Sequence, residues 1–196
     1  PDPAGLERGR AALLAQGIDG IEVLDLPEKN QLKVRARGVS AHGSTPELGD
    51  NAVIKLAQAL APVEGRGNLW AAVRFLRERI GRETDGRGLG IACQDEVSGA
   101  LTLNLGVVRT GAGKVWMEVD IRSPHSANHE AIKKKVAAHL QPYGLKIVES
   151  RTMAPHYLPV DHHLVQVLLQ VYREETGDQS PPVATGGRTY AATLGN

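Results

Sequence analysis

One histidine in the sequence stands in a loop-like stretch where an imidazole could meet a ligand. His42 lies in the run AHGSTPE at residues 41–47, between small residues that let the backbone bend and leave the ring unobstructed. The run follows a strand-like segment and precedes a helix-like one, and binding residues are often displayed on such loops. An imidazole there can donate to an oxyanion near neutral pH, which makes His42 a candidate catalytic residue. A histidine that only satisfies a turn is the alternative.

Two further stretches carry groups that could bind an anion. Arg122 ends a strand-like run in the sequence DIRSP, and a guanidinium at a strand end can fork onto a carboxylate. The alternative for this arginine is an ion pair with Asp120. Near the end of the sequence, the run TGGRT (185–189) contains Gly186 and Gly187, whose backbone N–H groups could converge on an anion. The glycine spacing is not that of a nucleotide-binding loop, so nucleotide binding has no support.

The remaining histidines and the single cysteine do not predict a metal site. A catalytic zinc is usually held by three protein ligands, and the sequence has neither an H-x-D nor an H-E-x-x-H motif. His162 and His163 are neighbours on a predicted helix and point in different directions. Cys93 cannot form a disulfide or a thiolate zinc site alone, and its apolar surroundings predict a buried thiol. We therefore expect no metal bound by this chain.

Composition and charge narrow the class of protein. Hydrophobic residues make up 41% of the 196 residues and charged residues 23%, which is typical of a globular domain. The formal net charge is +1 and the basic residues are scattered, which argues against nucleic acid as a partner. No run approaches the roughly 20 apolar residues of a membrane span. These features, with one free thiol, predict a cytoplasmic protein that contacts no membrane.

The patterning of polar and apolar residues predicts the elements that position these groups. Five runs are typical of strands: 21–26, 31–39, 101–107, 115–121 and 145–150. The third and fourth flank the turn Gly111-Ala112-Gly113 and should form an antiparallel hairpin. Four stretches read as helices: 4–16, 51–63, 68–80 and 128–140. Asp50 is the expected N-cap of the second of these helices. The order predicts an α+β fold, an antiparallel sheet with helices packed on one face.

The pattern of the sequence changes near residue 153, where the α+β segment ends. A proline-broken linker leads into an amphipathic helix at 161–176, with Gly177 at its end. We therefore expect three parts: a connector at residues 1–19, the α+β domain at 20–153, and a short helix-loop segment at 154–196.

Taken together, these segments resemble one family of zinc metallopeptidases, which includes aminoacylases, carboxypeptidase G and PepV-type dipeptidases. The form HGSTPE is closest to the PepV branch. The matching stretches, in order, are GVSAHGSTPE at 38–47, LNLGVVR at 103–109, DIRSP at 120–124, PHY at 155–157 and TGGRTY at 185–190. The resemblance implies a lid domain that closes over a dipeptide substrate, followed by a segment of the catalytic domain.

The resemblance also implies roles for the candidate residues. His42 would match the lid histidine that stabilises the tetrahedral oxyanion. Arg122 would match the lid arginine that grips the terminal carboxylate of the substrate. Gly186, Gly187 and Thr189 would match a loop whose backbone also meets the substrate.

The sequence departs from the family in two ways. The family's catalytic domain holds two zinc ions and a glutamate general base, and the motifs that supply them do not occur here. We therefore expect a truncated part of a dipeptidase that is inactive alone, with zinc held by the parent enzyme. In the glycine loop, Arg188 stands where a third glycine is usual, and Ala192 where an arginine is usual.

Two alternatives stay open beside the dipeptidase part. One is a standalone, non-catalytic binding or dimerisation module that borrowed the lid fold and self-associates through an exposed sheet edge. The other is a chain that supplies its lid in trans to a separate catalytic chain.

Overall fold

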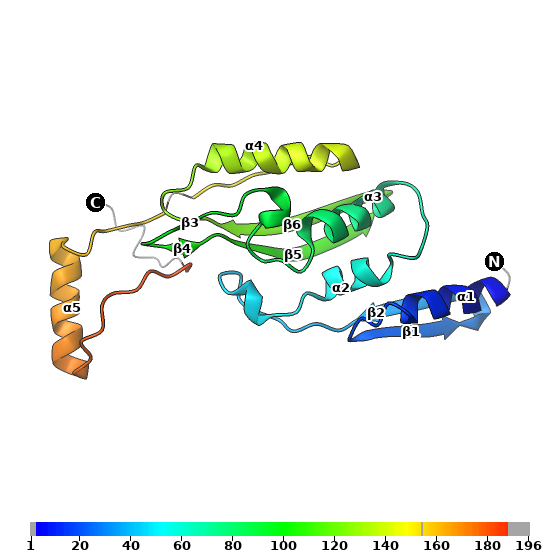
Figure 1. The fold of residues 1–196 in the computed structure, drawn as a ribbon, viewed down its shortest axis with the longest axis horizontal. Helices are drawn as coiled ribbons and strands as arrows, with labels where there is room; N and C mark the ends of the chain where they lie inside the picture. The colour runs from blue at the N-terminus through cyan, green and yellow to red at the C-terminus, as the bar shows by residue number, and fades with distance from the viewer. Residues whose placement is uncertain (1–2, 154, 188–196) are drawn as a thin grey trace.

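The computed structural model describes residues 3–153 and 155–187 and confirms the α+β class. Its strands pair into three two-stranded antiparallel sheets, β1 with β2, β3 with β4, and β5 with β6 (Figure 1). The strands are β1 (Ile21–Leu26), β2 (Gln31–Ala36), β3 (Gln94–Asp95), β4 (Gly99–Ala100), β5 (Thr102–Gly111) and β6 (Lys114–Arg122). The α-helices are α1 (Pro3–Leu14), α2 (Ala52–Ala59), α3 (Asn68–Phe75), α4 (His129–Leu140) and α5 (His163–Thr176).

The long hairpin β5–β6 is the frame that carries Arg122. Its turn places Ala112 at φ 49° and Gly113 at φ 70°, and two successive left-handed residues match the right-handed twist of the flanking strands. The register sets Thr102 opposite Arg122 and Asn104 opposite Asp120. Residues that face each other across a ladder point to the same side, so these four share one face of the hairpin. We call it the open face.

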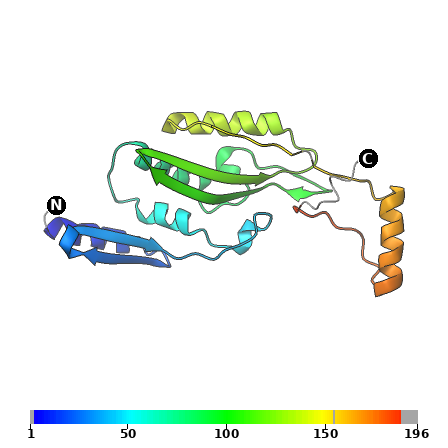
Figure 2. The same cartoon turned by 180° about the vertical axis from the view of Figure 1, so that it is seen from behind.

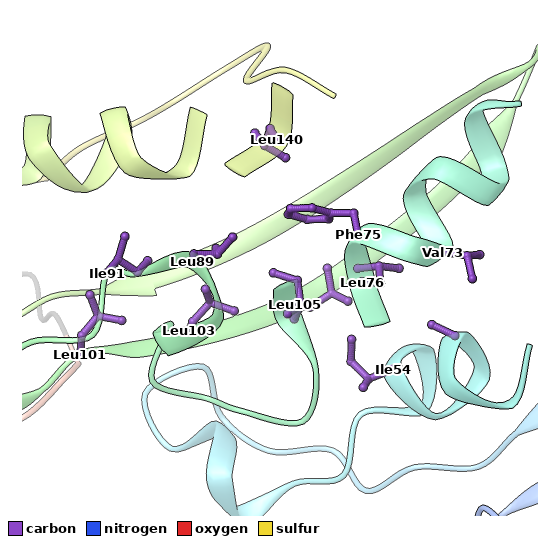
Figure 3. Packing of buried hydrophobic residues seen from close by; sticks show 12 residues of the cluster. Ile54, Val73, Phe75, Leu76, Leu89, Ile91, Leu101, Leu103, Leu105 and Leu140 are labelled. Atoms are coloured by element: carbon purple, nitrogen blue, oxygen red, sulfur yellow. The ribbon is translucent and has the colours of Figure 1, made fainter. Parts of the chain in front are cut away.

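The opposite face of this hairpin forms the core. Leu101, Leu103 and Leu105 are buried and pack into one cluster with residues from α2, α3 and α4 (Figure 3). The other members of the cluster are Ile54, Ala57, Val73, Phe75, Leu76, Ile80, Leu89, Ile91 and Leu140. Burying each large aliphatic side chain contributes about 1.5–3 kcal/mol, so this face anchors the hairpin. The prediction that helices cover one face of the sheet is confirmed.

The strands predicted at 21–26 and 31–39 also form, and they pair as a hairpin. β1 pairs with β2 from Ile21 opposite Ala36 to Leu26 opposite Gln31. A short turn of helix joins them and ends at Asn30, which takes the left-handed conformation at φ 51°. β2 stops at Ala36 rather than residue 39, because the chain then turns toward the loop that contains His42.

Residues 145–150 and Cys93 also depart from the sequence-based prediction. Residues 145–150 form no strand; Leu145 and Ile147 pack against the core without joining a ladder. Alternating apolar residues fit either arrangement, so the pattern alone could not separate them. Cys93 is exposed rather than buried. Its carbonyl accepts the backbone N–H of Leu101 over 2.8 Å.

Helix α5 stands apart from the rest of the structure, at the opposite end from α1 (Figures 1 and 2). His162 caps its N-terminus by accepting the backbone N–H of Leu164, and Gly177 ends it at φ 73°. None of its residues is buried. Its exposed apolar side chains are Leu164, Val167, Leu168, Val171 and Tyr172. Within the described residues, no helix is long and apolar enough to cross a membrane.

Candidate functional site

The loop that contains His42 is closed at its base by two backbone hydrogen bonds. Val39 and Asp50 exchange them, each over 2.9 Å, as an isolated antiparallel bridge. Gly38 and Gly49 flank this bridge, and a β-carbon on either would collide with backbone atoms across it. The glycines therefore let the two ends of the loop approach closely, and the residues between them, 40–48, form a tight unit.

The imidazole of His42 is exposed, and its hydrogen bonds fix which nitrogen faces outward. Nδ1 lies 2.7 Å from Ser44 Oγ, and the backbone N–H of Ser44 donates to Nδ1 over 3.3 Å. Because Nδ1 accepts this backbone donor, the neutral ring carries its proton on Nε2. Nε2 donates to no residue in the described part of the chain and is free to donate to a ligand.

Arg122 ends β6 with its side chain 30% exposed. Nε donates to Asp120 Oδ2 over 3.0 Å, and Nη1 donates to the carbonyl oxygen of Gly186. Nη2 faces Gly43, where a β-carbon would lie 3.3 Å from it. Nη2 donates to none of the described residues. The guanidinium is thus fixed on two sides and presents its remaining donor toward the loop of His42.

The structure brings together three segments that are distant in sequence. A β-carbon on Gly43, next to His42, would lie 2.7 Å from Asp120 Oδ2. Thr102 Oγ1 donates to the carbonyl of Gly43 over 3.4 Å, which fixes the loop on the open face. A β-carbon on Gly186 would lie 2.9 Å from Ser44 Cβ. The loop of His42, the end of β6 and the glycine loop therefore meet at one place, which can bind an anion.

The glycine loop presents a different backbone group from the one expected. The N–H of Gly187 donates to Thr185 Oγ1 over 3.2 Å and is engaged within the loop. It is the carbonyl of Gly186 that reaches Arg122. Thr189 lies outside the described residues, as do Arg188 and Ala192.

Sequence reasoning missed the residue that fixes the loop following Arg122. Asp95 Oδ1 accepts the backbone N–H groups of Val97 and Ser98 over 3.1 and 2.6 Å, and the Ser98 hydroxyl over 2.8 Å. Oδ2 accepts the backbone N–H and the hydroxyl of Ser126 over 3.1 and 2.8 Å. These donors, the Ser98 backbone N–H first, hold the pKa of Asp95 far below its usual range. An aspartate followed at the third position by serine is a recognisable turn signal.

Asn51 is the second residue whose role was missed, because Asp50 was the expected N-cap. The Asn51 side chain accepts the backbone N–H groups of Val53 and Ile54, and its amide donates to the carbonyl of Leu105 over 2.8 Å. It therefore caps α2 and ties the end of the His42 loop to β5. Asp50 is instead engaged by the buried Lys55.

The described residues include no group of three or more His, Cys, Asp or Glu side chains that could hold a metal ion. His42 on the closed loop and Arg122 on the hairpin each keep one hydrogen-bond donor, Nε2 and Nη2, without a partner among the described residues.

Comparison with known proteins assigns the family. Residues 30–147 match the model of the peptidase dimerisation domain of the M20 family. The protein named "Putative dipeptidase YtjP" of Bacillus subtilis (strain 168) is 32% identical over 168 residues, which cover 85% of this chain and 36% of that protein. "Putative dipeptidase SAUSA300_1697" of Staphylococcus aureus (strain USA300) is 29% identical over 164 residues, 83% of this chain and 35% of that protein. The chain belongs to the M20 peptidase family, and it spans about a third of the length of these curated relatives.

Proposed function

We propose that this chain is the lid part of a dipeptidase and that His42 and Arg122 bind the negative charge of a dipeptide. The observation that carries the proposal is the position of Gly43, one residue from His42, against the Asp120–Arg122 pair. Two donors without a described protein partner, His42 Nε2 and Arg122 Nη2, belong to segments that meet there. We call these two residues the clamp.

Each member of the clamp has a distinct role in the proposal. Arg122 binds the terminal carboxylate of the dipeptide, because a guanidinium forms strong charge-assisted hydrogen bonds with carboxylates. His42 donates through Nε2 to the oxyanion that develops when the peptide carbonyl is attacked, a contact that gains strength in the transition state. The Gly186 carbonyl accepts a hydrogen bond from the guanidinium, and in the proposal the loop of Gly186, Gly187 and Thr189 also meets the substrate.

Zinc enters the proposal only through the family. M20 peptidases generally use zinc, but the described residues do not fit a zinc site. We therefore place both zinc ions and the general base in the rest of the dipeptidase. It follows that these 196 residues alone bind substrate and do not hydrolyse it.

We also propose the division of the chain into a connector at 1–19, the lid domain at 20–153 and a catalytic-domain segment at 154–196. The exposed apolar stripe of α5 supports this division. An amphipathic helix normally buries such a stripe, and no described residue of the lid covers it. A further domain that packs on α5 would account for the stripe.

Binding of a carboxylate through Arg122 tests the clamp. Nuclear magnetic resonance titration of the ¹⁵N-labelled chain with Ala-Ala should shift the amides of Gly43 and Ser44. The terminal amide of the same dipeptide should bind about tenfold more weakly, since a charge-assisted hydrogen bond is lost. Arg122→Gln should abolish this difference. Arg109→Gln is the matched control, because Arg109 lies further along the same hairpin and pairs with Glu118 at 3.7 Å. Equal binding of acid and amide by the unmodified chain would refute the proposal.

The inactivity of the chain alone has a separate test. Hydrolysis of Ala-Ala by the purified chain with added zinc should not exceed the rate of buffer with zinc. Turnover that scales with the concentration of the chain and disappears with a chelator would place the metal site within these residues and overturn this part of the proposal.

A second proposal, self-association, is favoured by the description of the matching family model as a dimerisation domain. The second edge of β5 bonds to Thr84 and Asn51. The second edge of β6 pairs with no strand among the described residues, and such an edge can pair with another chain. Light scattering after gel filtration should give a mass near twice 21.0 kDa. A monomeric mass at all accessible concentrations would contradict it.

We propose the cytoplasm as the compartment. Cys93 is an exposed free thiol, and such thiols persist in reducing compartments.

A further inference from the structure

Asp120 lies beside Arg122 on the open face, and one of its two carboxylate oxygens is available to a ligand. Oδ2 accepts Arg122 Nε over 3.0 Å. Within the described part of the chain, Oδ1 accepts no hydrogen bond, and the Asp120 side chain is 47% exposed. The clamp therefore presents a carboxylate next to the guanidinium that binds the terminal carboxylate of the peptide.

The balance of charge around a bound peptide decides which peptides this pair favours. Arg122 and Asp120 neutralise each other, so the terminal carboxylate of a bound dipeptide adds one negative charge beside the pair. A basic side chain on the same peptide residue offsets that local charge. An acidic side chain adds a second negative charge close to the first, which is unfavourable.

The distances on a strand allow one peptide residue to contact both groups. Asp120 and Arg122 are two positions apart on β6, which separates their Cα atoms by about 7 Å. A lysine whose own carboxylate is bound by Arg122 carries its ammonium on a flexible four-carbon stem. That stem is long enough to bring the ammonium to Asp120 Oδ1.

We infer that Asp120 gives the clamp a preference for dipeptides whose carboxyl-terminal residue is basic. The inference rests on the proposed function, because it requires Arg122 to bind the terminal carboxylate. It adds the chemical class of the substrate, which the binding of a carboxylate alone leaves open.

Three dipeptides with a cationic, a neutral or an anionic carboxyl-terminal side chain test this preference. Ala-Lys, Ala-Gln and Ala-Glu are titrated at low salt into the ¹⁵N-labelled 196-residue chain, with the amides of Gly43 and Ser44 as reporters. Ala-Lys should bind about twofold to fivefold more tightly than Ala-Gln, and Ala-Glu more weakly by a similar factor, as expected for exposed ion pairs. Raising the ionic strength to 0.5 M should reduce both differences, because salt screens exposed charges.

Asp120→Asn assigns the preference to one carboxylate. This variant keeps the size of the side chain and removes its charge, so Ala-Lys and Ala-Glu should approach the affinity of Ala-Gln. Glu118→Gln is the matched control. Glu118 lies two positions before Asp120 on β6, on the same face, and pairs with Arg109. It should retain the preference of the unmodified chain.

The outcomes separate this inference from the proposed function. If Ala-Gln binds through Arg122 but the three peptides bind equally, the preference is refuted and the clamp stands. The same holds if the preference survives Asp120→Asn. If no peptide binds in a way that depends on Arg122, the clamp fails and the preference fails with it.

Discussion

Arg122 Nη2 lies 3.3 Å from the point that a β-carbon would occupy on Gly43, the residue next to His42. This proximity joins two segments that are nearly 80 residues apart in sequence. It depends on the absence of a side chain at Gly43, on the hydrogen bond from Thr102 to the Gly43 carbonyl, and on Asp120, which holds the guanidinium.

Gly43→Ala should weaken dipeptide binding about tenfold and change the free energy of unfolding by less than about 1 kcal/mol. The added methyl group would approach Asp120 Oδ2 to 2.7 Å and displace the Asp120–Arg122 pair, while the core stays intact. Peptide titration and urea unfolding measure the two effects. Gly106→Ala is the control, because a β-carbon there meets its nearest atom at an ordinary 3.8 Å. Unchanged binding by Gly43→Ala would show that the pair does not need its observed position.

Asp95→Asn should destabilise the chain at pH 7, and the difference from the unmodified chain should narrow in acid. The pKa of Asp95 is lower in the folded state than the ordinary aspartate value of about 3.9. The contribution of the charged Asp95 carboxylate to the free energy of unfolding is therefore fully present at pH values above that ordinary pKa. It is lost as the pH falls toward the folded-state pKa. Urea unfolding at pH 7, 4 and 3 measures the difference. A constant difference across this range would contradict the stabilising role of the charged carboxylate.

Asp50→Ala should cost about 2 kcal/mol of unfolding free energy, because it removes the main partner of a buried ammonium. The Lys55 side chain is only 4% exposed and is paired with Asp50, whereas Asp19 lies 3.7 Å away and is almost fully exposed. Lys55→Met should cost less than Asp50→Ala, since it removes the buried charge together with the pair. Thermal or urea unfolding measures both. Asp19→Ala, as control, should have little effect on the free energy of unfolding. A larger loss of unfolding free energy for Lys55→Met than for Asp50→Ala would contradict the role of Asp50 as the partner that compensates the buried Lys55 charge.

Local patterns predicted most of the strands because the alternation of polar and apolar residues depends on short spacings. The alternation of Leu103 and Leu105 predicted one apolar face of β5, and both residues are buried in the core. The small residues around His42 indicated an exposed loop, and the ring is exposed. The expectation that the two segments converge came from the family resemblance, and the structure brings the segments together.

The features of the site that the sequence did not predict depend on tertiary contacts, which no local pattern encodes. Asp50 and Asn51 are both good capping residues, and only the position of Lys55 decides that Asn51 caps α2. The donors around Asp95 come from two segments that meet only in the folded chain. The partner of Gly186 is Arg122, 64 positions away, so the sequence could not show that a carbonyl rather than an N–H group faces the guanidinium.

Binding of a single ligand that needs both members of the clamp is the most direct measurement. A phosphinic dipeptide analogue has a tetrahedral anionic centre for His42 and a terminal carboxylate for Arg122. Its dissociation constant is measured by titration calorimetry for the unmodified chain, His42→Ala, Arg122→Gln and the double variant. Each single variant should bind at least about tenfold more weakly, with a coupling of at least about 0.5 kcal/mol between them. Unchanged affinity in either single variant would show that the two residues do not bind one ligand together.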